Sequence, residues 1–367
     1  MTDPFPPFDP PRLFAETRYR VLAEAGLAAV VRGGWGEPFA ERDAGLAAFA
    51  ISTQGLSPLA ALLPALPSPL GEFLALQRER SLLRGRRIAG VLAEVVARLG
   101  KEGIEAVALK GAVLAFTRYA DPGDRPMADL DLLLADPGLM ERATAAMRTL
   151  GFHVLHDTGR HRVFALDGER VERHAEEHPG NPLRIELHRH YRIDVLGERL
   201  DVTHALLTNP STFPVNGVSV AAPSGEAERA LLLAHAAEDF AAKGLRGIQV
   251  MDFLRLRPFA LPEGLRGPRL LAASAIASLV PEVFDRTLPP PPPIPLLRHT
   301  RSPHGWTKTA LGLCDGRAAQ ARFLLRTLFP PPGELRANSG SGALPVLYAR
   351  TLFGRVLSAF GRGRGAG

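Results

Sequence analysis

The sequence is poor in several residues on which particular classes of protein depend. Its 367 residues include a single cysteine, Cys314, and 4 lysines, and aromatic residues make up 7%. One cysteine excludes an internal disulfide framework. No apolar run reaches the roughly 18 residues of a membrane helix, and the first residues lack the basic and apolar segments of a secretory leader. We therefore expect a cytoplasmic protein without membrane insertion.

The charge is basic overall but unevenly distributed. The net charge of +6 arises because residues 301–367 carry +8, while the rest of the chain sums to −2. A basic C-terminal region is suited to RNA or another polyanion, so RNA contact is one expectation. Aromatic residues for base stacking are sparse there, and arginine abundance alone also explains the charge. The hydrophobic content of 46% indicates a globular protein.

The segment with the most chemical information begins at Lys110-Gly111. The preceding residues 104–109 have the apolar content of a buried strand, and residues 112–119 are predicted to form a helix. Glycine allows the backbone to approach a ligand closely, and the first N–H groups of a helix favour an anion. Lys110 adds a positive charge suited to a triphosphate. Taken alone, the dipeptide is more typical of a solvated lysine beside an ordinary turn.

Two aspartates follow in a second apolar segment, residues 127–134. Residues two apart on a strand face the same way, so Asp129 and Asp131 would project together while the intervening leucines face the core. Adjacent carboxylates repel, and a divalent metal ion removes that conflict. Two solvated aspartates at a strand end remain an alternative.

A third carboxylate lies in the strand-like residues 183–188. Ile185 and Leu187 would face the core, which leaves Glu186 on the opposite face together with Arg184 and His188. Taken alone, Glu186 is more typical of a residue on the surface of a strand. Glu186 becomes a candidate site residue because its strand follows the segments that contain Lys110-Gly111 and the two aspartates.

The order of these segments resembles a known family. It is similar to the uncharacterised bacterial nucleotidyltransferases of the DNA polymerase β superfamily. The resemblance covers roughly residues 80–355 and is specific between 104 and 190; it is carried by Lys110-Gly111, Arg125, Asp129-Leu130-Asp131, Leu150-Gly151-Phe152 and Ile185-Glu186-Leu187-His188, with weaker matches around His235, Asp252 and Tyr348.

The resemblance implies transfer of a nucleoside monophosphate from an NTP to a hydroxyl-bearing acceptor, which could be a small molecule, a protein or RNA, with release of pyrophosphate. Asp129, Asp131 and Glu186 would be the catalytic residues. Asp129 and Asp131 would hold two Mg²⁺ ions and Glu186 would complete the catalytic metal site, with Mn²⁺ as an alternative, because hard oxygen ligands suit these ions. Two such ions would activate the attacking oxygen and neutralise the leaving one.

The resemblance also implies nucleotide contacts. Lys110, Gly111 and Arg125 would bind the phosphates, and His188 and His235 would lie around the site as second-shell residues. The chain departs from the superfamily at Ala112, where a serine commonly follows the glycine, so Lys110 would replace the serine contact.

We expect an α+β fold, with a polymerase β-like nucleotidyltransferase core around a small mixed sheet and helical regions on both sides. Proline runs and composition divide the chain further. The expected segments are a helical region at 1–100, the core at 101–222, a helical region at 223–288, a Pro-rich linker at 289–295, a basic helical region at 296–360 and a disordered tail at 361–367.

Two other functions remain open. A metal-dependent phosphohydrolase or nuclease could use the same carboxylates, but it would not need Lys110-Gly111 at a helix start. A degenerate nucleotide-binding module without catalysis would usually have lost one of the three carboxylates, and all three are present.

Overall fold

A computed structural model of the chain describes residues 4–5, 8–15, 18–36, 39–64, 66, 69–168, 177–178, 181–297, 310–330, 335 and 347–348. Most of the predicted basic region and all of the predicted tail lie outside these residues. None of the helices in the described part combines the length and the apolar character needed to cross a membrane.

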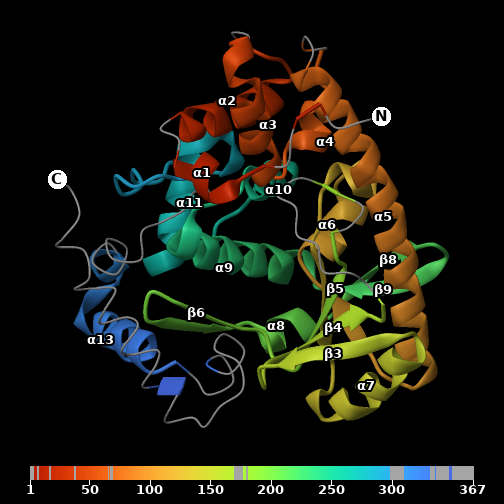
Figure 1. The fold of residues 1–367 in the computed structure, drawn as a ribbon. Coiled ribbons are helices and arrows are strands. Elements are labelled where there is room, and N and C mark those ends of the chain that lie inside the picture. Colours follow the sequence, from red (N-terminus) through yellow and green to blue (C-terminus); the bar gives the residue numbers. More distant parts are fainter. Residues whose placement is uncertain are drawn as a thin grey trace.

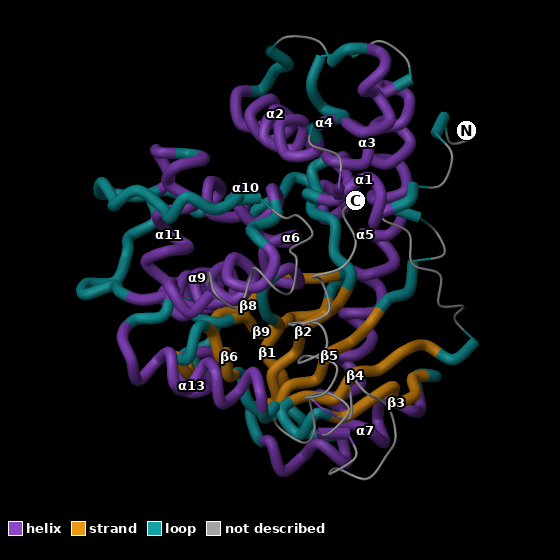
Figure 2. Tube along the Cα trace, turned by 60° about the vertical axis from the view of Figure 1, so that its left-hand side comes forward, coloured by secondary structure: helices purple, strands orange, loops and turns teal. Residues whose placement is uncertain are grey.

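The structure is α+β, as predicted, and is built around a seven-stranded mixed sheet (Figures 1 and 2). The strand order is β3-β4-β5-β2-β1-β9-β8, with β2 parallel to β5, β1 parallel to β9, and the other pairs antiparallel. The bounds are β1 Ala106–Ala108, β2 Asp129–Leu134, β3 Phe152–Asp157, β4 His161–Leu166, β5 Arg184–His188, β8 Ser211–Val215 and β9 Val218–Ala222; β6 Arg192–Val195 and β7 Glu198–Asp201 form a separate hairpin.

The helices lie before, between and after these strands. Their bounds are α1 Pro10–Ala15, α2 Tyr19–Arg32, α3 Ala44–Thr53, α4 Ser57–Ala60, α5 Leu70–Lys101, α6 Gly111–Thr117, α7 Met140–Thr149, α8 Thr203–Leu207, α9 Gly225–Lys243, α10 Gly247–Arg255, α11 Gly267–Leu279 and α13 Gly316–Leu328, with short 3-10 turns η1 Glu41–Asp43, η2 Pro122–Asp124, η3 Pro137–Leu139 and η4 Pro281–Val283.

Two apolar cores cover the two faces of the sheet. Leu130, Leu132 and Leu134 of β2 are fully buried against α5 and α7, as their alternation predicts. Leu133 faces the other way and joins a second core that includes α9, α10 and the N-terminal helices. In Figure 1 the strands accordingly lie between α5 and α9. Asp129 and Asp131 share the face of Leu133, so they point toward the α9 side.

Close backbone packing fixes the segment before β2. Gly85 of α5 faces Gly123 of η2, and a Cβ on Gly85 would lie 2.7 Å from the backbone nitrogen of Gly123. A Cβ on Gly123 would similarly lie 2.5 Å from the Cα of Leu82. Only glycine permits these approaches. The long helix α5 therefore holds the loop that leads into Asp129.

Local elements agree with the sequence patterns with some differences. The predicted strands at 104–109 and 127–134 are shorter in the structure: β1 lacks residues at both ends of the predicted segment, and β2 lacks the first two. Leu83 of α5 is 57% exposed. A single exposed leucine on a helix is normal, because the apolar periodicity predicts which face of the helix is buried but not the burial of each residue. The segment boundaries stay a prediction.

The glycine contact between α5 and η2 predicts a difference between two substitutions in one helix. We expect Gly85→Ala to lower the free energy of unfolding by about 1–3 kcal/mol, because the new methyl group meets backbone that cannot move independently. Gly90→Ala is the control. Gly90 is exposed in the same helix with no atom within 4 Å of its Cβ position, so alanine there should stabilise by about 0.5–1 kcal/mol. Urea unfolding measures both, and equal effects would contradict the packing.

Candidate functional site

The parallel pairing of β2 and β5 brings the carboxylates together. In this register Asp131 lies beside Glu186, and Asp129 lies beside Arg184. Ile185 and Leu187 are fully buried, so Glu186 and His188 project from the opposite face of β5. Two strands that are more than 50 residues apart in sequence therefore present acidic side chains on one surface.

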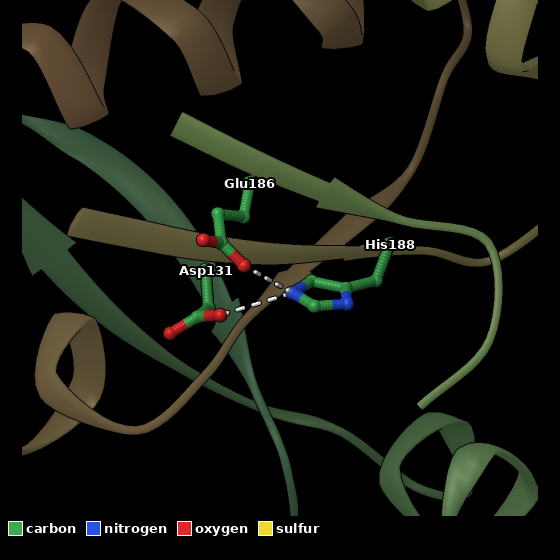
Figure 3. Close-up of side chains that lie close together, drawn as sticks. All are labelled: Asp131, Glu186 and His188. Carbon is green, nitrogen blue, oxygen red and sulfur yellow. Dashed lines mark hydrogen bonds and ion pairs between the residues drawn. The ribbon is translucent and has the colours of Figure 1, made fainter. Parts of the chain in front are cut away.

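Asp131, Glu186 and His188 form a compact cluster (Figure 3). One potential ligand atom of each lies within 4.8 Å of the others, and this is the one such cluster within the described part of the chain. The Nε2 atom of His188 lies 2.9 Å from Oδ1 of Asp131 and 3.6 Å from Oε2 of Glu186. Asp129 is exposed and lies outside this cluster, although it projects from the same face of β2. Two carboxylates and an imidazole are a donor set that suits a divalent ion.

Lys110 forms an ion pair with both oxygens of Asp131. Its Nζ lies 3.2 Å from Oδ1 and 3.2 Å from Oδ2. The backbone of Lys110 has φ 50° and ψ −119°, a conformation that costs a residue other than glycine roughly 1–3 kcal/mol. Glycine would adopt this turn without strain. The presence of lysine at position 110 is therefore explained by the contacts of its side chain and not by the backbone conformation.

These neighbours control the protonation of Asp131. Burial alone would raise the pKa of Asp131, but Lys110 and His188 hold it well below its usual range. Burial likewise tends to lower the pKa of Lys110, but its interactions with Asp131, Tyr191 and Asp129 together outweigh burial, and the pKa of Lys110 lies well above its ordinary value. Both groups are therefore charged at physiological pH.

Glu186 behaves in the opposite way. Its burial, together with the charges of Asp131 and Asp129, raises its pKa to about 7. His161 of β4 pairs with His188 in register, and its Nε2 lies 3.8 Å from Oε2 of Glu186. Burial and the neighbouring His188 lower the pKa of His161 to about 3, so its imidazole is neutral at pH 7. A cation bound between Asp131 and Glu186 would favour the ionised form of Glu186.

A cavity of about 260 Å³ opens beside the carboxylates. It is lined by Lys110 and Gly111, by residues 125–128 of the loop before β2, by Asp129 and Asp131 of β2, and by residues of α9 and α10 with Arg246 between these two helices. A second cavity of about 910 Å³ is lined by Glu186 and by residues of α1, α3, α5 and β3. Asp129 lines both cavities. The exposed aspartate therefore lies where the two spaces adjoin.

Arg125 lines the smaller cavity while it is held by a buried partner. Its Nε and Nη2 atoms donate to Asp252 of α10 at 2.8 and 2.7 Å, and Tyr119 donates to the same carboxylate at 2.8 Å. Its Nη1 would lie 2.5 Å from a Cβ on Gly111. Glycine at 111 is therefore required by the close approach of Arg125, in addition to any approach of a ligand.

The start of α6 differs from the expected phosphate turn. The helix has only seven residues, and the amides of Ala112 and Val113 already donate to the carbonyls of Leu109 and Lys110 at 3.1 Å. Lys110 is thus the main feature that this turn offers to an anion.

His235 lines the smaller cavity from α9. It lies 3.8 Å from both Glu238 and Asp239, the charged residues one turn further on. Its proximity also contributes to the low pKa of Asp131 across the cavity. The structure therefore places this predicted residue near the cluster without bringing it into contact.

Some residues around the site were not singled out from the sequence. Asp252 holds Arg125, Tyr191 lies under Lys110 with the ring centroid 5.2 Å from Nζ, and His161 lies beside His188. Their roles follow from strand register and from helix packing. A single sequence carries no direct signal of either, apart from the match of the Asp252 segment to the family pattern.

Comparisons with known proteins were made against families, curated proteins and solved structures. The model of a family described as "Uncharacterised nucleotidyltransferase" matches residues 48–258, more than half of the chain. The comparison with curated proteins finds no match. One matching solved structure is an antigenic nucleotidyltransferase-like protein from Paracoccidioides brasiliensis, with 16% identity and a TM-score of 0.36 over 53% of this chain and 89% of that one. The family assignment rests on the family model.

The raised pKa of Glu186 predicts a pH-dependent effect of Glu186→Gln on stability in the presence of a chelator. A raised carboxyl pKa means that its stabilising contribution is present below about 4.5 and is lost as the pH rises through about 7. We expect the variant to unfold like the native protein near pH 4 and to be more stable by on the order of 1–3 kcal/mol at pH 8. Urea unfolding at several pH values measures this, and an equal difference at pH 4 and 8 would contradict it.

Proposed function

The chain belongs to this family of uncharacterised nucleotidyltransferases, and from that premise we propose that it transfers a nucleoside monophosphate from an NTP to a hydroxyl-bearing acceptor. In this reaction the acceptor oxygen forms a bond to the α-phosphorus, the bond from that phosphorus to the bridging oxygen breaks, and pyrophosphate leaves. The observation that carries the proposal is the cluster of Asp131, Glu186 and His188 beside a cavity that Lys110 also lines.

Asp131 and Glu186 would hold a divalent ion, with Asp129 as a further carboxylate at its edge. The donor chemistry fits, because carboxylate oxygens converge there and the strand pairing fixes them side by side. When bound, such an ion neutralises phosphate charge and activates the attacking oxygen. The choice between Mg²⁺ and Mn²⁺ would depend on the third member of the cluster, His188.

The nucleotide phosphates would occupy the smaller cavity. Lys110, Arg125, Lys243 and Arg246 line it and supply positive charge. Asp252 holds Nε and Nη2 of Arg125, so its Nη1 atom would be the one to contact a phosphate without loss of the buried partner. Lys110 would turn from Asp131 toward the phosphates once a dication neutralises that carboxylate.

The acceptor would occupy the larger cavity. Its hydroxyl must reach the phosphorus that lies at the metal-binding carboxylates, and Asp129 is common to both spaces. The volume of about 910 Å³ falls within the range of small-molecule sites, roughly 300–1,000 Å³. The lining combines apolar side chains such as Phe14 and Leu155 with Arg184 and Arg246. These features favour a small molecule over a protein or RNA as acceptor.

The proposal predicts label transfer by the purified protein. We expect α-labelled NTP, supplied with Mg²⁺ or Mn²⁺ and a lysate fraction of small molecules, to yield a labelled product and pyrophosphate. Asp129→Asn and Asp131→Asn should reduce transfer to background, because each removes a carboxylate charge at the site. Asp136→Asn is the matched control, since Asp136 is exposed beyond the other end of β2 and accepts a hydrogen bond from Gly138. Transfer by Asp131→Asn at the native rate would refute the site.

The ion pair of Lys110 predicts opposite effects on metal binding and turnover. We expect Lys110→Met to tighten Mn²⁺ binding about tenfold, because an ammonium group no longer competes with a dication for Asp131. Turnover should fall, because the phosphates lose a cation. Titration of Mn²⁺ by electron paramagnetic resonance (EPR) measures the affinity. Lys243→Met is the control, since Lys243 pairs with Asp239 and not with Asp131, and its Mn²⁺ affinity should not change. Weaker Mn²⁺ binding by Lys110→Met would contradict the competition.

A further inference from the structure

His188 lies close enough to both carboxylates of the cluster to bind the same metal ion. Its side chain is buried, with 7% exposed, and a single atom, Nε2, faces both carboxylates of the cluster. Figure 3 shows the ring pointing between Asp131 and Glu186. As an N–H donor, Nε2 can form a good hydrogen bond with only one of the two carboxylates. As a metal ligand, Nε2 would coordinate the same ion as an oxygen atom of each carboxylate.

The strand pairing explains why the imidazole is fixed in this place. His188 and Glu186 are two residues apart on β5, so they project from the same face, and Asp131 lies opposite Glu186 on β2. The rings of His161 and Tyr191 each pack against the ring of His188, with centroids 5.0 Å from its centroid. Contact with two other rings restricts the rotation of the imidazole, which is the preorganisation that a metal ligand needs.

The resulting donor set is mixed. Mg²⁺ prefers oxygen ligands and retains water, whereas imidazole nitrogen suits first-row transition metals, and Mn²⁺ also accepts carboxylates readily. We propose that His188 Nε2 is a ligand together with Asp131 and Glu186, and that this nitrogen gives the site a preference for Mn²⁺ over Mg²⁺. The inference rests on the metal-dependent function proposed above, but it concerns the ligand set and can be tested on the metal itself.

The ligand atom can be read directly by pulsed EPR. We expect protein loaded with one equivalent of Mn²⁺ to show ¹⁴N modulation from an imidazole, and protein labelled with ¹⁵N-histidine to show the corresponding change. This measurement on the native chain does not depend on whether a variant folds. Native protein with bound Mn²⁺ and no nitrogen coupling would overturn the inference.

Three histidine variants assign the nitrogen. We expect His188→Asn to lose the coupling, and to lose the Mn²⁺ preference roughly tenfold or more when Mg²⁺ competes. His190→Asn is the control from the same segment, since His190 is absent from the cluster, and it should keep both. His161→Asn should also keep the coupling. Loss of the coupling in His161→Asn, with retention in His188→Asn, would place the ligand on β4 and overturn the assignment.

The two proposals can fail separately. Label transfer by a protein whose Mn²⁺ shows no nitrogen coupling would overturn the ligand role of His188 while the transferase remained. Nitrogen coupling in a protein that transfers no label would support the role of His188 as a ligand and would contradict the proposed transferase activity.

Discussion

The site depends on one structural interaction, the parallel pairing of β2 with β5 in a single register. That pairing places Asp131 beside Glu186 and brings His188 within 2.9 Å of Asp131. A slip of one residue would turn Glu186 and His188 toward the α5 side and bury them among leucines. The fully buried Ile185 and Leu187 oppose that slip, so the hydrophobic core specifies the geometry of the polar cluster.

Charge balance is the second constraint. A buried aspartate needs a compensating cation, and Lys110 supplies it from a strained turn, whereas Glu186 lies close to the imidazoles of His161 and His188. The cluster therefore contains one carboxylate that is firmly ionised and one whose pKa is raised to about 7. A cation bound at this pair would favour the ionised form of Glu186 and would compete with Lys110 for Asp131.

The sequence predicts more of the site than of its surroundings. Alternation along β2 and β5 is sufficient to place Asp131, Glu186 and His188 on polar faces, because side-chain direction on a strand is a local property. Strand neighbours are not local, so the sequence could not reveal that His161 lies beside His188 or that Asp129 is exposed outside the cluster. Arg125 and Gly111 illustrate the same limit. Each residue was predicted to contact a phosphate. The close approach of Arg125 to Gly111 and the hydrogen bonds from Arg125 to Asp252 arise from the packing of α10, which the sequence does not reveal.

The central claim is that these side chains bind a divalent ion that also meets the phosphates of an NTP. The most direct measurement is a crystal structure with Mn²⁺ and a non-hydrolysable NTP analogue, with anomalous diffraction to locate the manganese. The account predicts a manganese peak between Asp131 and Glu186, with nucleotide phosphates beside Lys110. A nucleotide bound elsewhere, or manganese that does not contact these carboxylates, would contradict it.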